Sequence, residues 1–182
     1  MAALVPITRV GTPRQSFINP SASNVITGTT ETAFDQIYTL PSQFSGYLPP
    51  NTTIRLRATG VITTGLASLG FTFRIRWGGV SGTVIATSGS INIVAGLSDG
   101  GWEVDSVIIL RYPAAAGTAE CDTRGRFQSG ALTTMSMYSP ATGTFAIDTT
   151  TTTDIVLTAQ WGLAVGGSIQ LRTYIVDIDF PP

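Results

Sequence analysis

The amino-acid sequence predicts an all-β fold: an antiparallel, jelly-roll-like β-sandwich with an extended N-terminal arm. Two patterns predict the sandwich. Most segments alternate apolar and polar residues with the period of two that is typical of half-buried strands, and almost none shows the helical period. Clusters of Gly, Pro, Ser and Asn separate these segments at intervals of roughly 8 to 15 residues, with no helical crossover between them. A chain of 182 residues is long enough to bury one core in a single domain.

The first 30 residues differ from the rest and predict the arm. They contain Pro6, Pro13 and Pro20 and show no regular period, so we place an arm over residues 1–30 and the sandwich over residues 31–182. Such a segment is either a frayed tail or an arm that lies along a neighbouring subunit. Its apolar content favours the second interpretation. The candidate interface residues of the arm are Leu4, Val5, Ile7, Val10, Phe17 and Ile18.

The strands follow in order along the sandwich. In IRLRATGVIT (54–63), Ile54 and Leu56 fall on one face and Arg55 and Arg57 on the other. FTFRIRW (71–77) repeats this pattern, which indicates half-buried strands with a wet outer face. Further strands are expected at 34–40, 83–87, 90–94, 102–112, 119–128, 144–147, 154–161 and 168–180. About ten strands suit a jelly roll.

Five consecutive threonines precede the strand at 154–161. We interpret Asp148 and residues 149–153 as the polar end of a connection, because β-branched threonines keep an extended backbone and stay soluble. In the strand, Ile155, Leu157, Ala159 and Trp161 are expected to face inward. The alternating Val156, Thr158 and Gln160 are expected to face outward or toward a neighbour.

Charged residues recur in like-charged pairs at i and i+2, which lie on one face of a strand. The arginine pairs are 55/57, 74/76 and 124/126, and the acidic pairs are 103/105, 120/122 and 177/179. In ECDTRGRFQ, one face carries Glu120, Asp122, Arg124, Arg126 and Gln128. An adjacent antiparallel strand would set carboxylates opposite arginines, so we predict a charged ladder, either within the chain or shared between subunits. Arg124 and Arg126 are therefore candidate interface residues.

Composition excludes several functions. Only 12% of residues are charged, against roughly 25% in an average domain. The net charge of −1 offers no clustered basic surface, so we expect neither nucleic acid nor a membrane as partner. The chain has no His and no Lys, which removes many general bases and metal ligands. We predict no enzyme activity, no catalytic or metal site and no cofactor. Cys121 is expected to be a small buried residue, and neither a signal peptide nor a membrane helix is apparent.

The three tryptophans, Trp77, Trp102 and Trp161, lie in or beside strands with apolar neighbours at i±2. This placement favours packing in the core. The alternative is a platform on which a sugar ring stacks, in a protein whose loops offer many hydroxyl and amide groups. Nothing in the sequence selects between these two roles.

The segments GWEVDSVIILRYPAAAGTAECDTRGRF, IDTTTTTDIVLTAQWG and SIQLRTYIVDI resemble small all-β virion structural proteins of tailed bacteriophages, of the capsid decoration or cement type. The similarity covers roughly residues 50 to 180 and consists of an order of strands and turns rather than a catalytic signature. It implies a jelly-roll module, commonly trimeric, that decorates a capsid or forms part of the tail.

We therefore expect a structural virion protein on the capsid exterior that stabilises a phage head by binding across shell subunits. Its expected partners are itself, as a homotrimer, and the major capsid protein. Two alternatives remain open. One is a tail-fibre or receptor-binding tip that recognises host glycans, and the other is a jelly-roll protein that forms the shell itself.

Overall fold

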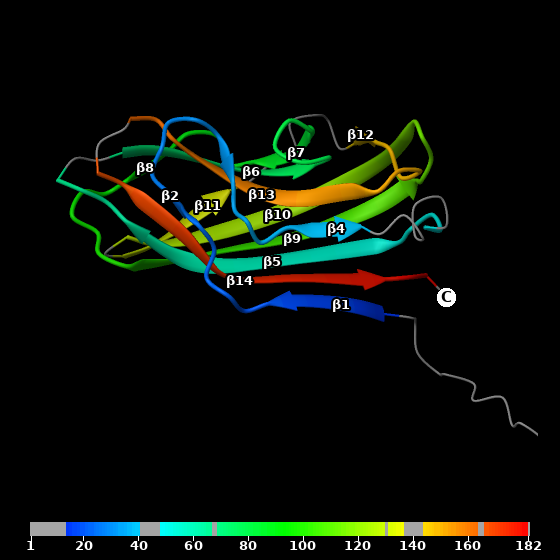
Figure 1. Ribbon diagram of the computed structural model, residues 1–182, viewed down its shortest axis with the longest axis horizontal. Helices are drawn as coiled ribbons and strands as arrows, with labels where there is room; N and C mark the ends of the chain where they lie inside the picture. Colours follow the sequence, from blue (N-terminus) through cyan, green and yellow to red (C-terminus); the bar gives the residue numbers. More distant parts are fainter. Residues whose placement is uncertain are drawn as a thin grey trace, which may run out of the picture.

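The computed structural model of the chain describes residues 14–40, 48–66, 69–129, 131–136, 144–163 and 166–181. Over these ranges the chain forms two antiparallel β-sheets that pack as a sandwich, without a helix (Figure 1). No described segment forms a helix long and apolar enough to cross a membrane. The predicted all-β antiparallel sandwich is confirmed.

The larger sheet, sheet A, has eight strands in the order β1-β14-β5-β9-β10-β11, with β2 pairing with β14 and β12 with β10. Its long strands alternate buried and outward-facing residues, as the sequence pattern requires. The strands are β1 (Arg14–Asn19), β2 (Val25–Ile26), β5 (Thr53–Thr63), β9 (Gly100–Tyr112), β10 (Gly117–Ser129), β11 (Ala131–Ser136), β12 (Phe145–Ile147) and β14 (Ser168–Asp179).

The smaller sheet, sheet B, has six strands in the order β3-β13-β6-β7, with β4 pairing with β13 and β8 with β6. Early strands pair with late strands in both sheets, β5 with β14 and β6 with β13, which gives the wrapped connectivity of a jelly-roll-like sandwich. The strands are β3 (Thr32–Ala33), β4 (Tyr38–Leu40), β6 (Leu69–Trp77), β7 (Thr83–Thr87), β8 (Ile91–Ile93) and β13 (Thr153–Trp161).

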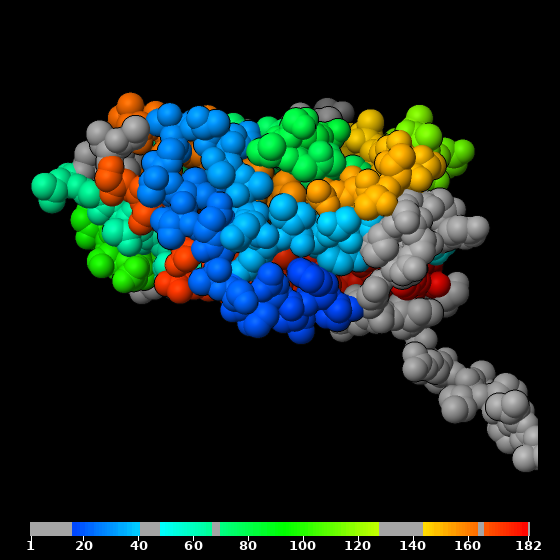
Figure 2. All heavy atoms as spheres, in the orientation of Figure 1, coloured from blue at the N-terminus to red at the C-terminus, as the bar shows by residue number. Residues whose placement is uncertain are grey.

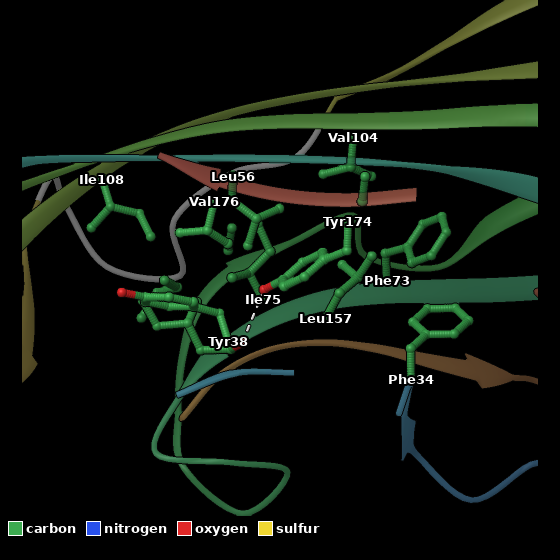
Figure 3. Close-up of a cluster of buried hydrophobic side chains, with 14 of the residues drawn as sticks. Phe34, Tyr38, Leu56, Phe73, Ile75, Val104, Ile108, Leu157, Tyr174 and Val176 are labelled. Carbon is green, nitrogen blue, oxygen red and sulfur yellow. Dashed lines mark hydrogen bonds between the residues drawn. The ribbon is translucent and has the colours of Figure 1, made fainter. Parts of the chain in front are cut away.

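The core lies between the two sheets and is built from their inward-facing side chains. Figure 3 shows Leu56 and Val104 of sheet A facing Ile75 and Leu157 of sheet B. Each of these side chains is fully buried. Tyr174 is also fully buried, and its hydroxyl donates a 2.9 Å hydrogen bond to the carbonyl of Ile155 across the core. This bond satisfies a polar group that would otherwise be costly to bury.

The predicted arm divides into two parts. Residues 1–13 lie outside the described residues, and for them the arm stays a prediction. Residues Arg14–Asn19 form β1, which pairs antiparallel with β14 of the same chain, and Val25–Ile26 form β2 beside β14. For these residues the expectation of an arm outside the core is corrected, because main-chain pairing and the packing of Phe17 against the core join them to sheet A.

Most predicted strands are confirmed, with ends that differ by two residues at most. Of the strand expected at 34–40, only residues 38–40 form a strand, β4, and the short strand β3 lies just before the expected range. Asp35, between β3 and β4, pairs instead with Asn24: each side chain accepts a 3.0 Å hydrogen bond from the main-chain N–H of the other residue. This local pairing replaces the ladder with β13 over a short stretch. Strand β11 was not predicted.

Candidate interaction surface

The outer face of sheet A carries rows of alternating charge. Neighbouring strands contribute opposite signs: aspartates on β14, arginines on β5, acidic residues on β9 and arginines on β10. The register aligns Arg55 with Asp177, Arg57 with Asp105, Arg124 with Asp105, and Arg126 with Glu103. We call this surface the charged face.

Ion pairs link these strands. The N–O distance is 3.5 Å in each of the cross-strand pairs Arg55–Asp179, Arg57–Asp105 and Arg126–Glu103. The predicted charged ladder is therefore confirmed within the chain. The three arginine side chains are 59%, 65% and 67% exposed. Each pair consequently contributes at most about 1 kcal/mol, and less at high salt.

Arg124 and Arg126 keep most of their side-chain surface in solvent, at 85% and 67% exposed. The Arg124 guanidinium nitrogen Nη2 lies 3.7 Å from the carboxylate oxygen Oδ2 of Asp122 on the same strand. Their guanidinium groups thus retain hydrogen-bond donors that a partner could engage. An interface through these two residues stays a prediction.

At one end of the charged face, Arg111 and Glu120 form an ion pair with an N–O distance of 2.5 Å. A hydrogen bond from Arg111 lowers the pKa of the Glu120 carboxyl below its usual range. Conversely, the same bond raises the pKa of Arg111. Both side chains are at least one-third exposed, so the pair orients two surface groups rather than supporting the core.

A more enclosed ionic cluster lies on the outer face of sheet B, and we call it the Glu31 clamp. Glu31 accepts hydrogen bonds of 2.6 and 2.7 Å from Arg76 in a two-pronged arrangement. It also accepts bonds from Arg74 at 3.1 Å and from the Thr158 hydroxyl at 2.6 Å. Glu31 is 18% exposed and Arg76 15%. The clamp therefore fixes the segment before β3 to β6 and β13.

Burial raises the pKa of the Glu31 carboxyl, but hydrogen bonds from Arg76 and Thr158 and the charges of Arg74 and Arg76 outweigh it. The net result is a pKa below the ordinary value of 4.5. Figure 2 shows residues 16–40 (blue to light blue) as a band on the visible face beside β13 (orange). The clamp is one of the contacts that holds this band in place.

The role of Glu31 was not predicted, because this residue directly follows the predicted arm. Two features of the sequence point to an ion pair between Glu31 and the arginines of β6. Glu31 is the first acidic residue of the chain, and the pair Arg74/Arg76 has no acidic pair on β7 or β13, the two long neighbours of its strand. Thr158 is fully buried and Val156 is 1% exposed, although both face outward from sheet B.

Two of the arm residues with predicted interface roles have described side chains. Phe17 packs on the same chain, with ring centroids 5.5 Å from Tyr38 and 6.4 Å from Tyr174. Ile18 points away and is 61% exposed. Phe17 therefore contributes to the sandwich, whereas Ile18 remains accessible to a neighbour. The other predicted arm residues, Leu4, Val5, Ile7 and Val10, lie outside the described residues.

The three tryptophans are buried, so packing in the core is confirmed for them. Trp77, Trp102 and Trp161 are 4%, 3% and 1% exposed. Each indole N–H donates to a main-chain carbonyl, of Asp148, Val61 and Ile26 respectively. A platform for a stacked sugar needs an open ring face. The alternative role as a sugar platform is therefore wrong for these residues.

The threonine run is anchored at both ends. The Asp148 carboxylate accepts bonds of 2.8 Å from the Thr150 N–H and 2.7 Å from its hydroxyl, and these bonds lower the Asp148 pKa. Thr149 is fully buried and its N–H donates to Ala114. Thr153 begins β13. The run is thus a polar connection that leads into a strand, as predicted.

Cys121 lies partly buried against the core, with its sulfur 3.2 Å from the Ser106 hydroxyl and 3.0 Å from the Thr123 hydroxyl. Burial raises the pKa of this thiol, which favours its protonated form. Among the described residues, no group of three or more His, Cys, Asp or Glu side chains is arranged to hold a metal ion.

No family model matches this chain, and no curated protein matches its sequence. Among solved structures, the chain is similar to the CBM2 module of the evolved Dit of Lactobacillus casei BL23 phage J-1, with a TM-score of 0.33 and 15% identity over 80% of this chain and 70% of that one. It is also similar to a chain in the structure of the infectious bursal disease virus Gx strain. The TM-score is 0.37 and the identity 13%, over 100% of this chain and 47% of that one.

A third similar structure is the VP2 subviral particle of infectious bursal disease virus, with a TM-score of 0.32 and 12% identity over 100% of this chain and 46% of that one. The chain thus spans about half the length of these two bursal disease virus chains. At such identities and TM-scores, the likeness does not extend to function.

Proposed function

We propose that this chain is a structural component of a virus particle, of the capsid decoration or cement type, and that it binds on the capsid exterior. The observation that carries the proposal is the placement of the segments that resemble phage virion proteins. These segments, residues 101–127, 147–162 and 168–178, contribute most of β9, β10, β13 and β14, four interior strands of the two sheets. The resemblance therefore follows the body of the sandwich rather than one loop.

Attachment at the edge of sheet A supports an arm that reaches a neighbour. Strand β1 is the edge strand on the β14 side, and the apolar residues 1–13 directly precede it in the chain. An edge strand offers unpaired main-chain groups on its outer side. Exposed Ile18 adds an apolar contact at the same edge. The arm, Ile18 and the edge together form the proposed contact with an adjacent subunit.

The stabilising mechanism is mass action. A protein that binds only the assembled shell lowers the free energy of that state and leaves free subunits unaffected. The partners are the major capsid protein and further copies of this chain. A homotrimer fits a three-fold position on a shell, because closed symmetric oligomers are the common form of association. The charged face, with its paired charges, suits contact with solvent.

Deletion of residues 1–13 tests the arm without removing any described strand. We expect the shortened chain to fold with unchanged stability but to bind capsids at least tenfold more weakly in a co-sedimentation assay. The matched control is Leu66→Ser, which removes a fully exposed apolar side chain from a loop outside the arm. Capsid binding that is equal for the full-length and shortened chains would contradict the role of the arm.

A further inference from the structure

A hollow of about 490 Å³ opens on the charged face, near the start of β9. Its lining combines Gly60 and Gly101 with the polar residues Thr59, Glu103 and Arg126 and the aromatic residues Trp102 and Phe127. Gly101 is paired with Val61 and adds no side chain to the outer face there. This volume lies in the range of roughly 300–1,000 Å³ that is typical of small-molecule sites.

Arg172 joins the wall of this hollow because of a bulge in β14. Leu171 pairs with Gly60 and Thr173 with Thr59, so Arg172 is the extra residue between two consecutive partners on β5. A bulge interrupts the alternation of the strand and can redirect a side chain toward a site. Here it adds a fourth polar side chain to the hollow beside Thr59.

Among the arginines whose side chains the structure describes, Arg172 differs in having no acidic partner. It is exposed, and it forms no ion pair with any residue of the described ranges. Every other arginine with a described side chain forms one, namely Arg55, Arg57, Arg74, Arg76, Arg111, Arg124 and Arg126. Of the described arginines, Arg172 is thus the one without an ion pair, and the bulge places it at the hollow.

The charges that line the hollow do not cancel. Arg126 lies 3.5 Å from Glu103, a loose pair in which Arg126 is 67% exposed. Arg172 adds a second guanidinium against this single carboxylate. The hollow thus has an excess positive charge and, at the same time, one carboxylate and the Thr59 hydroxyl that can accept hydrogen bonds.

We propose that this hollow binds a carboxylated saccharide. The planar guanidinium of Arg172 pairs with the sugar carboxylate through two parallel hydrogen bonds. Glu103 and Thr59 accept hydrogen bonds from ring hydroxyls, and the main chain at Gly101 lets the ring approach closely. This site adds a binding activity to the structural role proposed above and does not depend on it.

An acidic peptide uses the hollow less well than such a sugar. It offers carboxylates to Arg172, but a second carboxylate would be repelled by Glu103. Aspartate and glutamate side chains also bring no hydroxyl group to the Glu103 acceptor, which would then lose water without gaining a partner. A neutral sugar satisfies Glu103 and Thr59 but leaves Arg172 unpaired. Only a ligand with both groups engages Arg172, Glu103 and Thr59 together.

Titration of the isotope-labelled full chain by two-dimensional NMR tests the site, with glucuronate as the probe and glucose as the neutral comparison. We expect glucuronate to shift the amide signals of Gly60, Gly101 and Arg172 saturably, and glucose to bind at least tenfold more weakly. Arg172→Gln should weaken glucuronate binding at least tenfold. Arg55→Gln, which removes an exposed and paired arginine elsewhere on the charged face, should leave it unchanged.

Several results would overturn the proposal. One is that glucuronate shifts no amide signal saturably, and another is that glucose and glucuronate bind equally well. A third is that Arg172→Gln and Arg55→Gln weaken glucuronate binding to the same extent. A short aspartate-rich peptide that shifts the same signals as strongly as glucuronate would assign the hollow to an acidic protein partner instead. Because Arg172 is exposed, its variant is expected to fold, and the dispersion of its own spectrum verifies this.

Discussion

Glu31 joins segments of the chain that are distant in sequence, because its carboxylate contacts Arg76 on β6 and Thr158 on β13. Arg76 has a second anchor, a 2.7 Å bond from its guanidinium to the Gly82 carbonyl. Hydrogen bonds to a charged group that is mostly shielded from water are stronger than those between exposed ions. The clamp is therefore expected to matter more for stability than any pair on the charged face.

Replacing Glu31 with Gln tests this ranking. We expect Glu31→Gln to lower the free energy of unfolding by about 1.5–3 kcal/mol, because Arg74 and Arg76 lose their shared carboxylate. The matched control is Glu103→Gln, which removes an exposed carboxylate and should cost at most about 1 kcal/mol. Urea unfolding of both variants at neutral pH measures the difference, and equal losses would contradict the clamp.

The same carboxylate predicts a dependence of stability on pH. The folded-state pKa of Glu31 lies below its ordinary value of 4.5, so the folded state favours the ionised form. Its stabilising contribution is fully present above about pH 4.5 and is lost as the pH falls through the folded-state pKa. The stability difference between the parent chain and Glu31→Gln should therefore shrink on acidification, as measured by urea unfolding between pH 7 and pH 3. A constant difference would contradict this assignment.

At the residue scale, the sequence predicted side-chain direction well but missed specific partners. Alternation placed Ile54, Leu56 and Trp161 inward, and all three are buried. The like-charged pairs at i and i+2 predicted the ladder, because strand geometry puts both members on one face. The Glu31 clamp could not be derived in this way, since it joins residues 43 and 127 positions apart.

At the scale of elements, β1 is held by main-chain pairing and by one large side chain. Phe17 packs between Tyr38 and Tyr174, while its neighbour Ile18 faces away. The strand was not predicted because prolines surround it and its sequence, RQSFIN, lacks a clear alternation. Its extended form is imposed by β14, which supplies the partner groups. Strand β11 likewise follows from its pairing with β10.

The two side chains of β1 give a direct comparison. Phe17→Ala should lower the free energy of unfolding by about 1–3 kcal/mol, because a partly buried ring leaves its contacts with two tyrosines. Ile18→Ala should change it by no more than about 0.5 kcal/mol, because Ile18 is mostly exposed. Thermal unfolding monitored by circular dichroism measures both. A larger effect at Ile18 would mean that β1 packs with the opposite face.

Close approach of β5, β9 and β14 depends on Gly60. A Cβ atom there would lie 2.1 Å from the Gln170 carbonyl oxygen and 2.5 Å from the Trp102 ring. Gly60→Ala should therefore destabilise the protein by about 1–3 kcal/mol or more, because main chain must move. At Gly28, where the nearest atom would be 3.9 Å away, the change to Ala should be nearly neutral. Equal urea midpoints for both variants would contradict this packing.

At the scale of the whole molecule, the sequence predicted the sandwich because each of its long strands carries its own alternation. The connectivity is less local. Pairing β5 with β14 and β6 with β13 joins segments that are far apart in the sequence, and only packing determines that choice. The charged face and the Glu31 clamp then lie on opposite outer faces of the two sheets. One face is left for solvent and ligands, and on the other Glu31 contacts Arg76 and Thr158.

As a structural part of a virus particle, the proposed role for this protein, the chain would sit on the outside of the head. Immunogold labelling of intact particles, with an antibody against this chain, tests this proposal. We expect label spread over the head surface. Label confined to the tail would contradict the decoration role, and particles that carry no label would contradict the claim altogether.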